Sequence, residues 1–372
     1  MSFVRKKIVN GRAYFQLVEN VSKDGKAKQK VVRHLGTEEN AIEYCRKHGI
    51  QFPSQQKETR TSGFFDSTKQ TAEFLTALRG RKEIPLKFEY LRKGAENWKK
   101  TVESKTYGLG KMENELIQEN AKRIVQDVGK ANIVDIGCGT GEKAFPFIQE
   151  MKRLARPKYI AFDISPEMIA LAKTNLEKRF PKLNTRFVVA DFEQSNLAEE
   201  MESIREKNFK KSLFLFLGNT VGNVSDKSRV LANLRDSMTL EDNLLVGIEL
   251  FDLGRISKIF DHYRNSPEAK VAMLNTLNYF GVSEHDGKFV VSFNREKSQA
   301  EAHFVMKRAC KLKLGSRQIL LRKGDNILVM TSYKATPKQL QILLADSGFV
   351  ILQLYLSPQE DYALILCKPA KF

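Results

Sequence analysis

The chain has 372 residues, of which 42% are hydrophobic, and it carries a formal net charge of +18 at pH 7. This length and composition predict a globular protein with a substantial core and more than one domain. No apolar run reaches the roughly 18 residues of a membrane helix, and the N-terminus lacks the apolar core of a signal peptide. The charge favours contact with polyanions, although adaptation to a hot or salty cytoplasm also biases protein charge.

The cysteine and histidine residues form no pattern that predicts a metal site or a disulfide framework. The four cysteines are Cys45, Cys138, Cys310 and Cys367, which lie far apart in the sequence without a CxxC pair. The five histidines make no HxxxH or HExxH pair. We therefore expect a cytoplasmic protein from a reducing compartment, without a bound metal.

Residues 1–36 have the pattern of a small β unit. Residues 14–18 and 28–32 are strand-like, and the sequence SKDGK between them is a hairpin turn signal. Nine Lys and Arg residues against two acidic residues give this segment a net charge of +7, and it resembles the basic N-terminal hairpin of some transposase-like proteins. It is either a nucleic-acid-binding element or a solvated hairpin. We expect a helix over residues 37–48 and a linker over residues 51–62.

Mostly helical sequence over residues 64–128 precedes a strand at residues 133–136 that runs into a glycine-rich turn. This turn reads GCGTGEK, with glycines at alternate positions, and a helix follows it. Glycine lets the backbone turn sharply and lets a ligand approach closely, and the N-terminus of a helix favours negative charge. Such a turn by itself also serves dinucleotides and mononucleotides.

The next two predicted strands end in acidic residues. Residues 159–162 lead into Asp163, where a carboxylate can hold both hydroxyls of a ribose. Residues 186–190 lead into Asp191 and Phe192, an acid and an aromatic ring that suit the edge and the face of an adenine.

This succession of DxGxGxG, strand-Asp and strand-Asp-Phe resembles class I S-adenosylmethionine-dependent methyltransferases. The alternative is a glycine turn of another doubly wound fold. The resemblance implies an α/β fold of Rossmann-like type, with a seven-stranded and mostly parallel sheet, and S-adenosylmethionine as the cofactor. It also implies a role for Lys143 at the methionine carboxylate of the cofactor, where the alternative is an exposed lysine in the first helical turn. The implied cofactor-binding residues are Asp135, Gly137, Gly139, Gly141, Lys143, Asp163, Asp191, Phe192, Gly218 and Asn219.

The remaining elements agree with this sheet. The segments 213–217 and 244–250 are apolar throughout, as expected of parallel strands covered on both faces. A closing helix with Thr336 as its N-cap and Pro337 at its first position is followed by strand-like residues 350–356 and 362–367.

Residues 251–335 are too long for a simple crossover. Their strand-like pieces are residues 289–293, 303–307, 319–322 and 327–331. We expect an inserted α+β substrate domain over the carboxyl ends of the sheet. The expected organisation is a hairpin-plus-helix unit (1–50), a linker (51–62), the methyltransferase domain (63–250 and 336–372) and the insertion (251–335).

The segment 216–223 reads FLGNTVGN, and this turn resembles that of the histidine-specific methyltransferase family. The resemblance covers residues 64–372. It implies that Asn223 and Tyr263 hold the carboxylate of the substrate and that Tyr107 lies near its amino group. The alternatives are that Asn223 caps a helix and that Tyr263 is a packing residue.

Two positions depart from the family. Where its histidine-methylating enzyme has a Glu-Ile-Ser triplet that binds the imidazole, this chain has Met330-Thr331-Ser332, and Ala302 replaces a methionine. A buried imidazole N–H without an acceptor would cost about 1–3 kcal/mol. The resemblance therefore implies a reshaped substrate pocket at Ala302, Met330 and Ser332, and histidine is not the expected substrate.

Three functions follow from these features. The first is an N-methyltransferase that acts on the α-amino group of an amino acid or a related small-molecule amine. The second is a methyltransferase that acts on RNA or protein and docks through the basic residues 1–36. The third is a binding protein without catalysis, against which the intact glycine turn and the paired acids argue. The sequence alone gives neither the acceptor, nor the number of methyl groups transferred, nor the oligomeric state.

Overall fold

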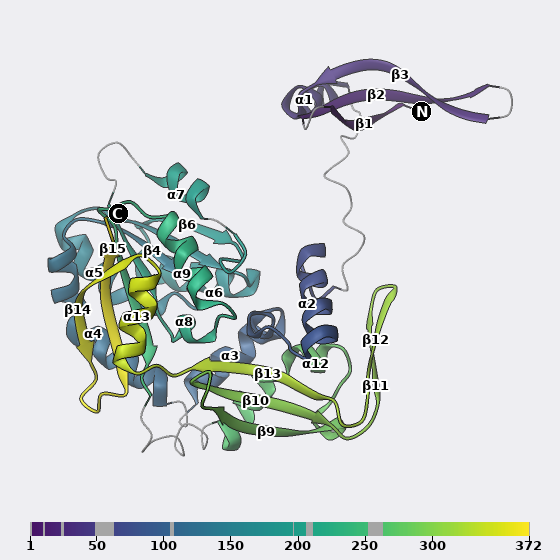
Figure 1. Ribbon diagram of the computed structural model, residues 1–372. Helices are drawn as coiled ribbons and strands as arrows, with labels where there is room; N and C mark the ends of the chain where they lie inside the picture. The colour runs from purple at the N-terminus through teal and green to yellow at the C-terminus, as the bar shows by residue number, and fades with distance from the viewer. Residues whose placement is uncertain are drawn as a thin grey trace. The chain divides into compact units, whose positions relative to one another are not determined.

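A computed structural model of the chain divides into two compact units, Met1–Gly63 and Phe64–Phe372 (Figure 1). The structure describes residues 2–9, 12–23, 26–48, 63–104, 108–195, 197–205, 211–251 and 263–371. The predicted linker over residues 51–62 therefore lies outside the described residues.

The first unit is a three-stranded antiparallel sheet with one helix. Strands β1 (Ser2–Val9), β2 (Arg12–Lys23) and β3 (Lys26–Gly36) lie in this order and are followed by α1 (Glu38–His48). A small core of Val4, Phe15, Leu17, Leu35, Ala41 and Cys45 joins the sheet to the helix. The two predicted strands and the helix are confirmed, whereas β1 was not predicted as a strand.

The second unit is built on a seven-stranded sheet of order β14-β15-β8-β7-β4-β5-β6, in which β15 alone runs antiparallel to its neighbours. The strands are β4 (Asn132–Ile136), β5 (Lys158–Asp163), β6 (Asn184–Val189), β7 (Ser212–Phe216), β8 (Asn243–Glu249), β14 (Phe349–Leu356) and β15 (Tyr362–Pro369). The predicted α/β fold with a mostly parallel sheet is confirmed.

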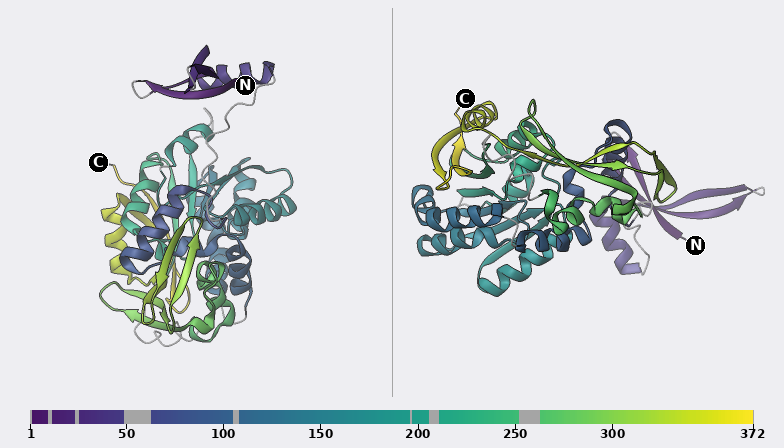
Figure 2. Two further views of the ribbon diagram at one scale, coloured as in Figure 1. Left: turned by 90° about the vertical axis from the view of Figure 1, so that its right-hand side faces the viewer. Right: turned by 90° about the horizontal axis from the view of Figure 1, so that it is seen from below.

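Helices cover both faces of this sheet, as Figures 1 and 2 show. The core on one face contains side chains of α4 (Gly108–Val128), α5 (Phe145–Leu154) and α6 (Pro166–Arg179). The core on the other face contains those of α7 (Ala198–Ile204), α9 (Lys227–Asp236) and α13 (Pro337–Asp346). Successive residues of a strand point to opposite faces, so the inner strands need apolar residues at nearly every position, whereas the edge strands β6 and β14 are partly exposed.

The insertion forms a second, smaller sheet of order β13-β10-β9 and a separate hairpin (Figure 1). The strands are β9 (Gly287–Asn294), β10 (Gln299–Met306), β11 (Cys310–Leu314), β12 (Arg317–Leu321) and β13 (Asn326–Tyr333), and the short helices are α11 (Pro267–Met273), α12 (Asn275–Tyr279) and η4 (Glu284–Asp286). All four predicted strand segments are confirmed. The strand β11 was not predicted.

The segment ahead of the large sheet packs with the insertion. It forms α2 (Thr68–Arg81), the 3-10 helix η1 (Leu86–Tyr90) and α3 (Lys93–Glu103). Phe74 and Phe88 belong to the same core as Phe304 of β10, and the Ile84 N–H donates to the Leu328 carbonyl of β13 at 2.8 Å. The predicted helical character of residues 64–128 is confirmed, and these contacts fix η1 against the insertion.

Candidate active site

The glycine turn after β4 has a backbone that only glycine adopts easily. Gly137, Gly139 and Gly141 all have positive φ angles, of 66°, 54° and 74°. A Cβ atom on Gly141 would come within 2.6 Å of Leu176 on α6, whereas a Cβ atom on Gly139 would meet nothing within 4 Å. The loop therefore packs closely on α6 at Gly141 and leaves open space at Gly139.

Two buried carboxylates lie at this end of the sheet. Asp163, the last residue of β5, accepts the backbone N–H groups of Gly139 and Ser165, both at 3.0 Å. Burial raises the pKa of Asp163 to about 6. Burial likewise raises the pKa of Asp135 to about 7, although the Tyr159 hydroxyl donates to this carboxylate at 2.7 Å. Both carboxyl groups therefore titrate close to neutral pH in the ligand-free protein.

Lys143 is held by a buried carboxylate of α4. Its ammonium group forms an ion pair with Glu113. The same carboxyl group accepts the Gly218 N–H and the Tyr362 hydroxyl, each at 2.6 Å. Glu113 thus joins the glycine turn, the end of β7 and β15, and it fixes Lys143 beside the turn.

The acid after β6 is paired with a lysine from η1. Lys87 lies 2.8 Å from Asp191 and 2.8 Å from Glu73, and it is buried. Phe192 packs edge-on against Phe216 with 5.9 Å between the ring centroids. The side chain of Lys87, far upstream in the sequence, therefore meets the predicted adenine-binding pair Asp191 and Phe192.

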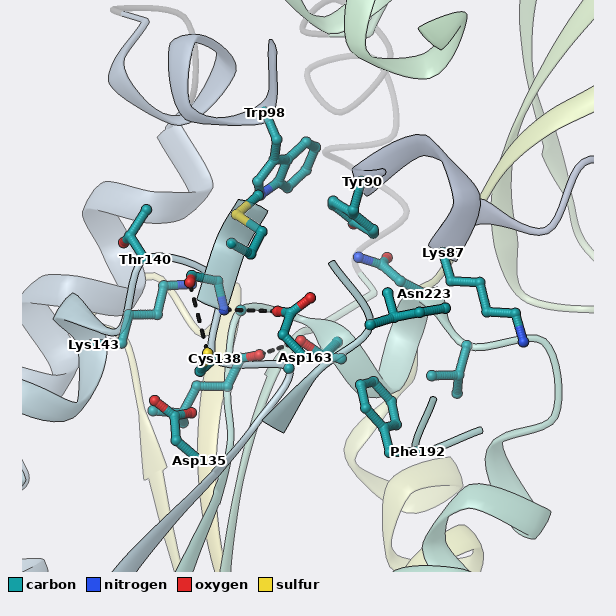
Figure 3. Close-up of a pocket in the computed structure, with 18 of the residues that line it drawn as sticks. Lys87, Tyr90, Trp98, Asp135, Cys138, Thr140, Lys143, Asp163, Phe192 and Asn223 are labelled. Carbon is teal, nitrogen blue, oxygen red and sulfur yellow. Dashed lines mark hydrogen bonds between the residues drawn. The ribbon is translucent and has the colours of Figure 1, made fainter. Parts of the chain in front are cut away.

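A large cavity opens at this end of the sheet (Figure 3), with about 1090 Å³ of space, part of it open to solvent. Eight of the ten predicted cofactor residues line it: Asp135, Gly137, Gly139, Lys143, Asp163, Asp191, Phe192 and Gly218. The other two do not line it, because Gly141 packs against α6 and Asn219 is buried in a hydrogen-bond network.

A second, smaller cavity of about 350 Å³ adjoins the first, and its lining includes both Trp98 and Asn223, which also line the large cavity. The full lining is Leu86, Trp98, Thr101, Asn223, Tyr263, Ala269, Met273 and Met330. This space, like that of the large cavity, is partly open to solvent. Trp98 and Asn223 thus form a wall common to both cavities.

The predicted substrate residues fall into three groups. Asn223, Tyr263 and Met330 line the small cavity together. Ala302 pairs with Met330 between β10 and β13, but its side chain is buried in the core and lines neither of these two cavities. Ser332 lies behind the wall and donates to the Asn223 side chain at 3.1 Å. Tyr107 lies outside the described residues.

The alternative that Asn223 caps a helix is wrong. Asn223 is the last residue of the short helix α8 (Thr220–Asn223), and the N-cap of the next helix, α9, is Asp226, whose side chain accepts the Arg229 N–H at 3.0 Å. Asn223 therefore does not cap a helix. It lines both cavities, and Figure 3 shows it near Tyr90.

Sequence reasoning missed the three residues that the segment ahead of the sheet supplies. Lys87 and Tyr90 of η1 and Trp98 of α3 all line the large cavity (Figure 3). Tyr90 and Trp98 pack edge-on at 5.3 Å, and the Tyr90 side chain is hydrogen-bonded to Asn223. Burial raises the pKa of Tyr90. These residues form no motif, and only the fact that Trp98 is the single tryptophan of the chain distinguishes any of them in the sequence.

Two further observations concern the described part of the chain alone. It contains no cluster of three or more His, Cys, Asp or Glu side chains that could hold a metal ion. It also contains no helix with the length and apolar character needed to cross a membrane.

The strand order and the cavity at the carboxyl ends of the parallel strands define a class I methyltransferase. A model of the S-adenosylmethionine-dependent histidine-specific methyltransferase family matches residues 69–369, and the chain belongs to this family. It is an enzyme whose methyl donor is S-adenosylmethionine.

Among known relatives, a histidine N-alpha-methyltransferase of Mycolicibacterium smegmatis is 23% identical over 296 residues, which are 77% of this chain and 90% of the relative. The N-methyltransferase imqF of Aspergillus flavus is 20% identical over 335 residues, which are 83% of this chain and 89% of the relative. Among solved structures, magnesium protoporphyrin IX methyltransferase of Synechocystis with bound S-adenosylmethionine matches with 11% identity and a TM-score of 0.42, covering 81% of this chain and 97% of the other.

Proposed function

We propose that this methyltransferase acts on the α-amino group of a free amino acid or a related small amine. The observation that carries this proposal is the wall formed by Trp98 and Asn223, which line both the large and the small cavity. A donor in the large cavity and an acceptor in the small one would meet at this wall.

The large cavity has the groups that S-adenosylmethionine requires. Asp163 has lone pairs left for the ribose hydroxyls after accepting two backbone N–H groups. Phe192 offers a ring face to the adenine, and Lys143 offers a cation to the methionine carboxylate. The buried carboxyl groups of Asp135 and Asp163 in the lining of this cavity suit a cofactor that carries a positive sulfonium charge.

The small cavity has groups for the two ends of an amino acid. Asn223 and Tyr263 would hold the carboxylate, as the family resemblance implies. Tyr90, which lines the large cavity beside Asn223, would orient the amino group from that side. Tyr107 remains a prediction for the same amino group. The insertion supplies Tyr263 and Met330, and on this proposal it is the substrate-binding part of the chain.

The reaction needs little covalent chemistry from the protein itself. When bound, S-adenosylmethionine supplies a methyl group that its sulfonium already activates. The protein must bind the acceptor amine in its neutral form and align its nitrogen with the methyl–sulfur bond. An α-amino group has a pKa of about 7.7–8.0, so a neutral fraction exists at pH 7. Because burial raises the pKa of Tyr90, this residue stays a hydroxyl and orients the amine without acting as a base.

The acceptor side chain should differ from that of histidine. The lining of the small cavity has no carboxylate among the residues that the structure describes, and Met330 stands where the family's histidine enzyme has its acid. An imidazole N–H would have no acidic partner there, which would cost roughly tenfold to a hundredfold in affinity. A less polar side chain fits these surroundings better.

The proposal is tested by incubating the purified protein with labelled S-adenosylmethionine and a cell extract separated into small molecules, RNA and protein. We expect label in the small-molecule fraction, on an α-amino nitrogen. Label confined to RNA or protein would refute the proposal. The four cysteines are unpaired in the structure, which supports our further proposal of a cytoplasmic location.

A second candidate function is methylation of RNA or protein docked through residues 1–36. The observation that favours it is the charge of this segment, on which Lys7, Lys30 and Arg33 are exposed. Strong positive charge attracts nucleic acid without specifying a sequence. The first unit could therefore serve as a docking element.

A further inference from the structure

A buried ion pair lies behind the wall that the two cavities share. Lys334, directly after β13, is fully buried, and its ammonium group is paired with Glu249, the last residue of β8. Burial alone would lower the pKa of Lys334, but the charge of Glu249 and the hydrogen bonds to Glu249 and Tyr263 outweigh it, so the pKa is raised and the lysine stays charged. A buried lysine is costly without a partner, and this one is retained beside the substrate cavity.

The ammonium group of Lys334 reaches two residues besides Glu249. It donates to the Ser332 hydroxyl at 3.1 Å, and it is hydrogen-bonded to the Tyr263 side chain. An ammonium group only donates, so the Tyr263 oxygen accepts this bond. Tyr263 lines the small cavity next to this ion pair.

The second branch runs through two asparagines whose amide orientations follow from their partners. The backbone N–H of Glu249 donates to Asn219 Oδ1 at 3.0 Å, which fixes that amide. Asn219 Nδ2 consequently donates to Ser332 Oγ at 3.0 Å and to Asn223 Oδ1 at 3.3 Å. Because a backbone N–H can only donate, the direction of this chain of bonds does not depend on an arbitrary amide assignment.

The Ser332 hydroxyl donates in turn to Asn223. Its oxygen accepts from both Lys334 and Asn219, so its own proton is left for Asn223 Oδ1, 3.1 Å away. With its oxygen so occupied, Asn223 turns its Nδ2 group toward the cavities, where its side chain is hydrogen-bonded to Tyr90. In every hydrogen bond along this path, the acceptor therefore lies on the side of Asn223.

We propose that Lys334, held by Glu249, is a positioning residue that makes Asn223 a hydrogen-bond donor toward the acceptor. A donor at this end of the small cavity suits a carboxylate and disfavours an ammonium group, so it also fixes which end of an amino acid lies there. This inference rests on the proposed function of the small cavity. It adds Glu249, Lys334 and Asn219, none of which lines that cavity.

The first test reads the hydrogen-bond network directly and needs no acceptor. Tyrosine is labelled with ¹³C at the ring carbon that bears the hydroxyl, and the signals of Tyr90 and Tyr263 are assigned with the Tyr90→Phe and Tyr263→Phe variants. The double variant Glu249→Gln/Lys334→Met removes the pair without leaving a buried charge. We expect it to shift both signals, although Lys334 reaches Tyr90 only through Ser332 and Asn223.

The variant Ser332→Ala separates the two branches and leaves the ion pair in place. It should shift the Tyr90 signal and leave that of Tyr263 unchanged. The matched control is Lys227→Met, because Lys227 is a partly buried lysine that lies over the ring of Tyr333, between Ser332 and Lys334 in the sequence. This control should move neither signal.

The second test is kinetic. With an amino acid as acceptor, the double variant should raise the acceptor KM by roughly tenfold to a hundredfold, the effect of lost hydrogen bonds to a charged group, and leave the Kd for S-adenosylmethionine unchanged. Loss of affinity for both ligands would indicate general damage and overturn the inference.

A Tyr90 signal that stays in place in the double variant or in Ser332→Ala would also overturn the inference. If the double variant does not fold, the Ser332→Ala result decides. Absence of methyl transfer to any amino acid would instead refute the proposed function, and the tyrosine signals distinguish that result from failure of the positioning network.

Discussion

Individual carboxyl groups give this site its most unusual local chemistry. Asp135 and Asp163 are buried at the carboxyl ends of neighbouring parallel strands, and burial raises the pKa of each, to about 7 and about 6. An acid with a raised pKa in the folded state keeps a proton that the unfolded chain releases. The ligand-free fold therefore loses stability as pH rises from about 4 through these values.

This linkage predicts that Asp135→Asn stabilises the ligand-free protein at pH 8 and has little effect at pH 4. The amide oxygen can still accept the Tyr159 hydroxyl, and no charge remains to be desolvated. Thermal unfolding of both proteins between pH 4 and pH 8 measures the effect, with a difference in Tm of several degrees expected at pH 8. A difference in Tm that stays constant over this range would contradict the pKa assignment.

The glycine turn allows a matched comparison of two residues. Gly139→Ala and Gly141→Ala both force alanine into the left-handed region, at a cost of roughly 1–2 kcal/mol. The Gly141 variant also crowds Leu176, and overpacking costs about 1–3 kcal/mol more. Chemical denaturation should therefore show a larger loss of unfolding free energy for Gly141→Ala. Equal losses would mean that α6 moves away without cost.

At the scale of elements, the short helix η1 connects the insertion to the cofactor cavity. Phe88 packs in the core shared with the insertion, while Lys87 and Tyr90 of the same helix line the large cavity. The ion pair between Lys87 and Asp191 thus joins two parts of the second unit across the predicted adenine site.

We expect Lys87→Met to weaken S-adenosylmethionine binding by about tenfold or more, because it leaves Asp191 and Glu73 without their cation. The control is Lys82→Met, which removes a partly exposed ion pair with Asp325 that is worth about 0–1 kcal/mol. Fluorescence titration can follow binding, since Trp98 is the single tryptophan and lines the cavity. Equal affinities of the two variants would show that Lys87 has no part in the cofactor site.

The elements also show what the sequence could and could not predict. The inner strands β4, β5, β7, β8 and β15 were predictable because strands buried on both faces are apolar at nearly every position. The acids at the carboxyl ends of β5 and β6 have no other reason to follow such runs. The strand β1 was missed because three charged residues interrupt its apolar pattern. Lys87, Tyr90 and Trp98 were missed because tertiary packing against the insertion, and no local pattern, brings them to the cavity.

At the scale of the whole molecule, the chain divides into two compact units, of which the first is small and basic. The glycine turn and both cavities belong to Phe64–Phe372, whereas residues 1–36 carry a net charge of +7. Each unit has its own core among the described residues. Methyl transfer to a small amine should not depend on the first unit.

A truncated protein containing residues 64–372 tests this division. We expect its rate of methyl transfer to a small acceptor to stay within about twofold of that of the full chain. We also expect any salt-sensitive binding of the full chain to tRNA, measured by gel shift, to be lost on truncation. A truncated protein that folds, binds S-adenosylmethionine and fails to methylate the small acceptor would contradict the division and favour a docked polymer substrate.

The central claim is that the site binds the α-amino acid end of its acceptor and has a side-chain pocket unsuited to histidine. The most direct measurement is one competition reaction with the twenty common amino acids at equal concentration, in which mass spectrometry locates the methyl groups. The account predicts methylation on the α-nitrogen of an amino acid other than histidine. Preferential methylation of histidine, or no methylated amino acid at all, would contradict it.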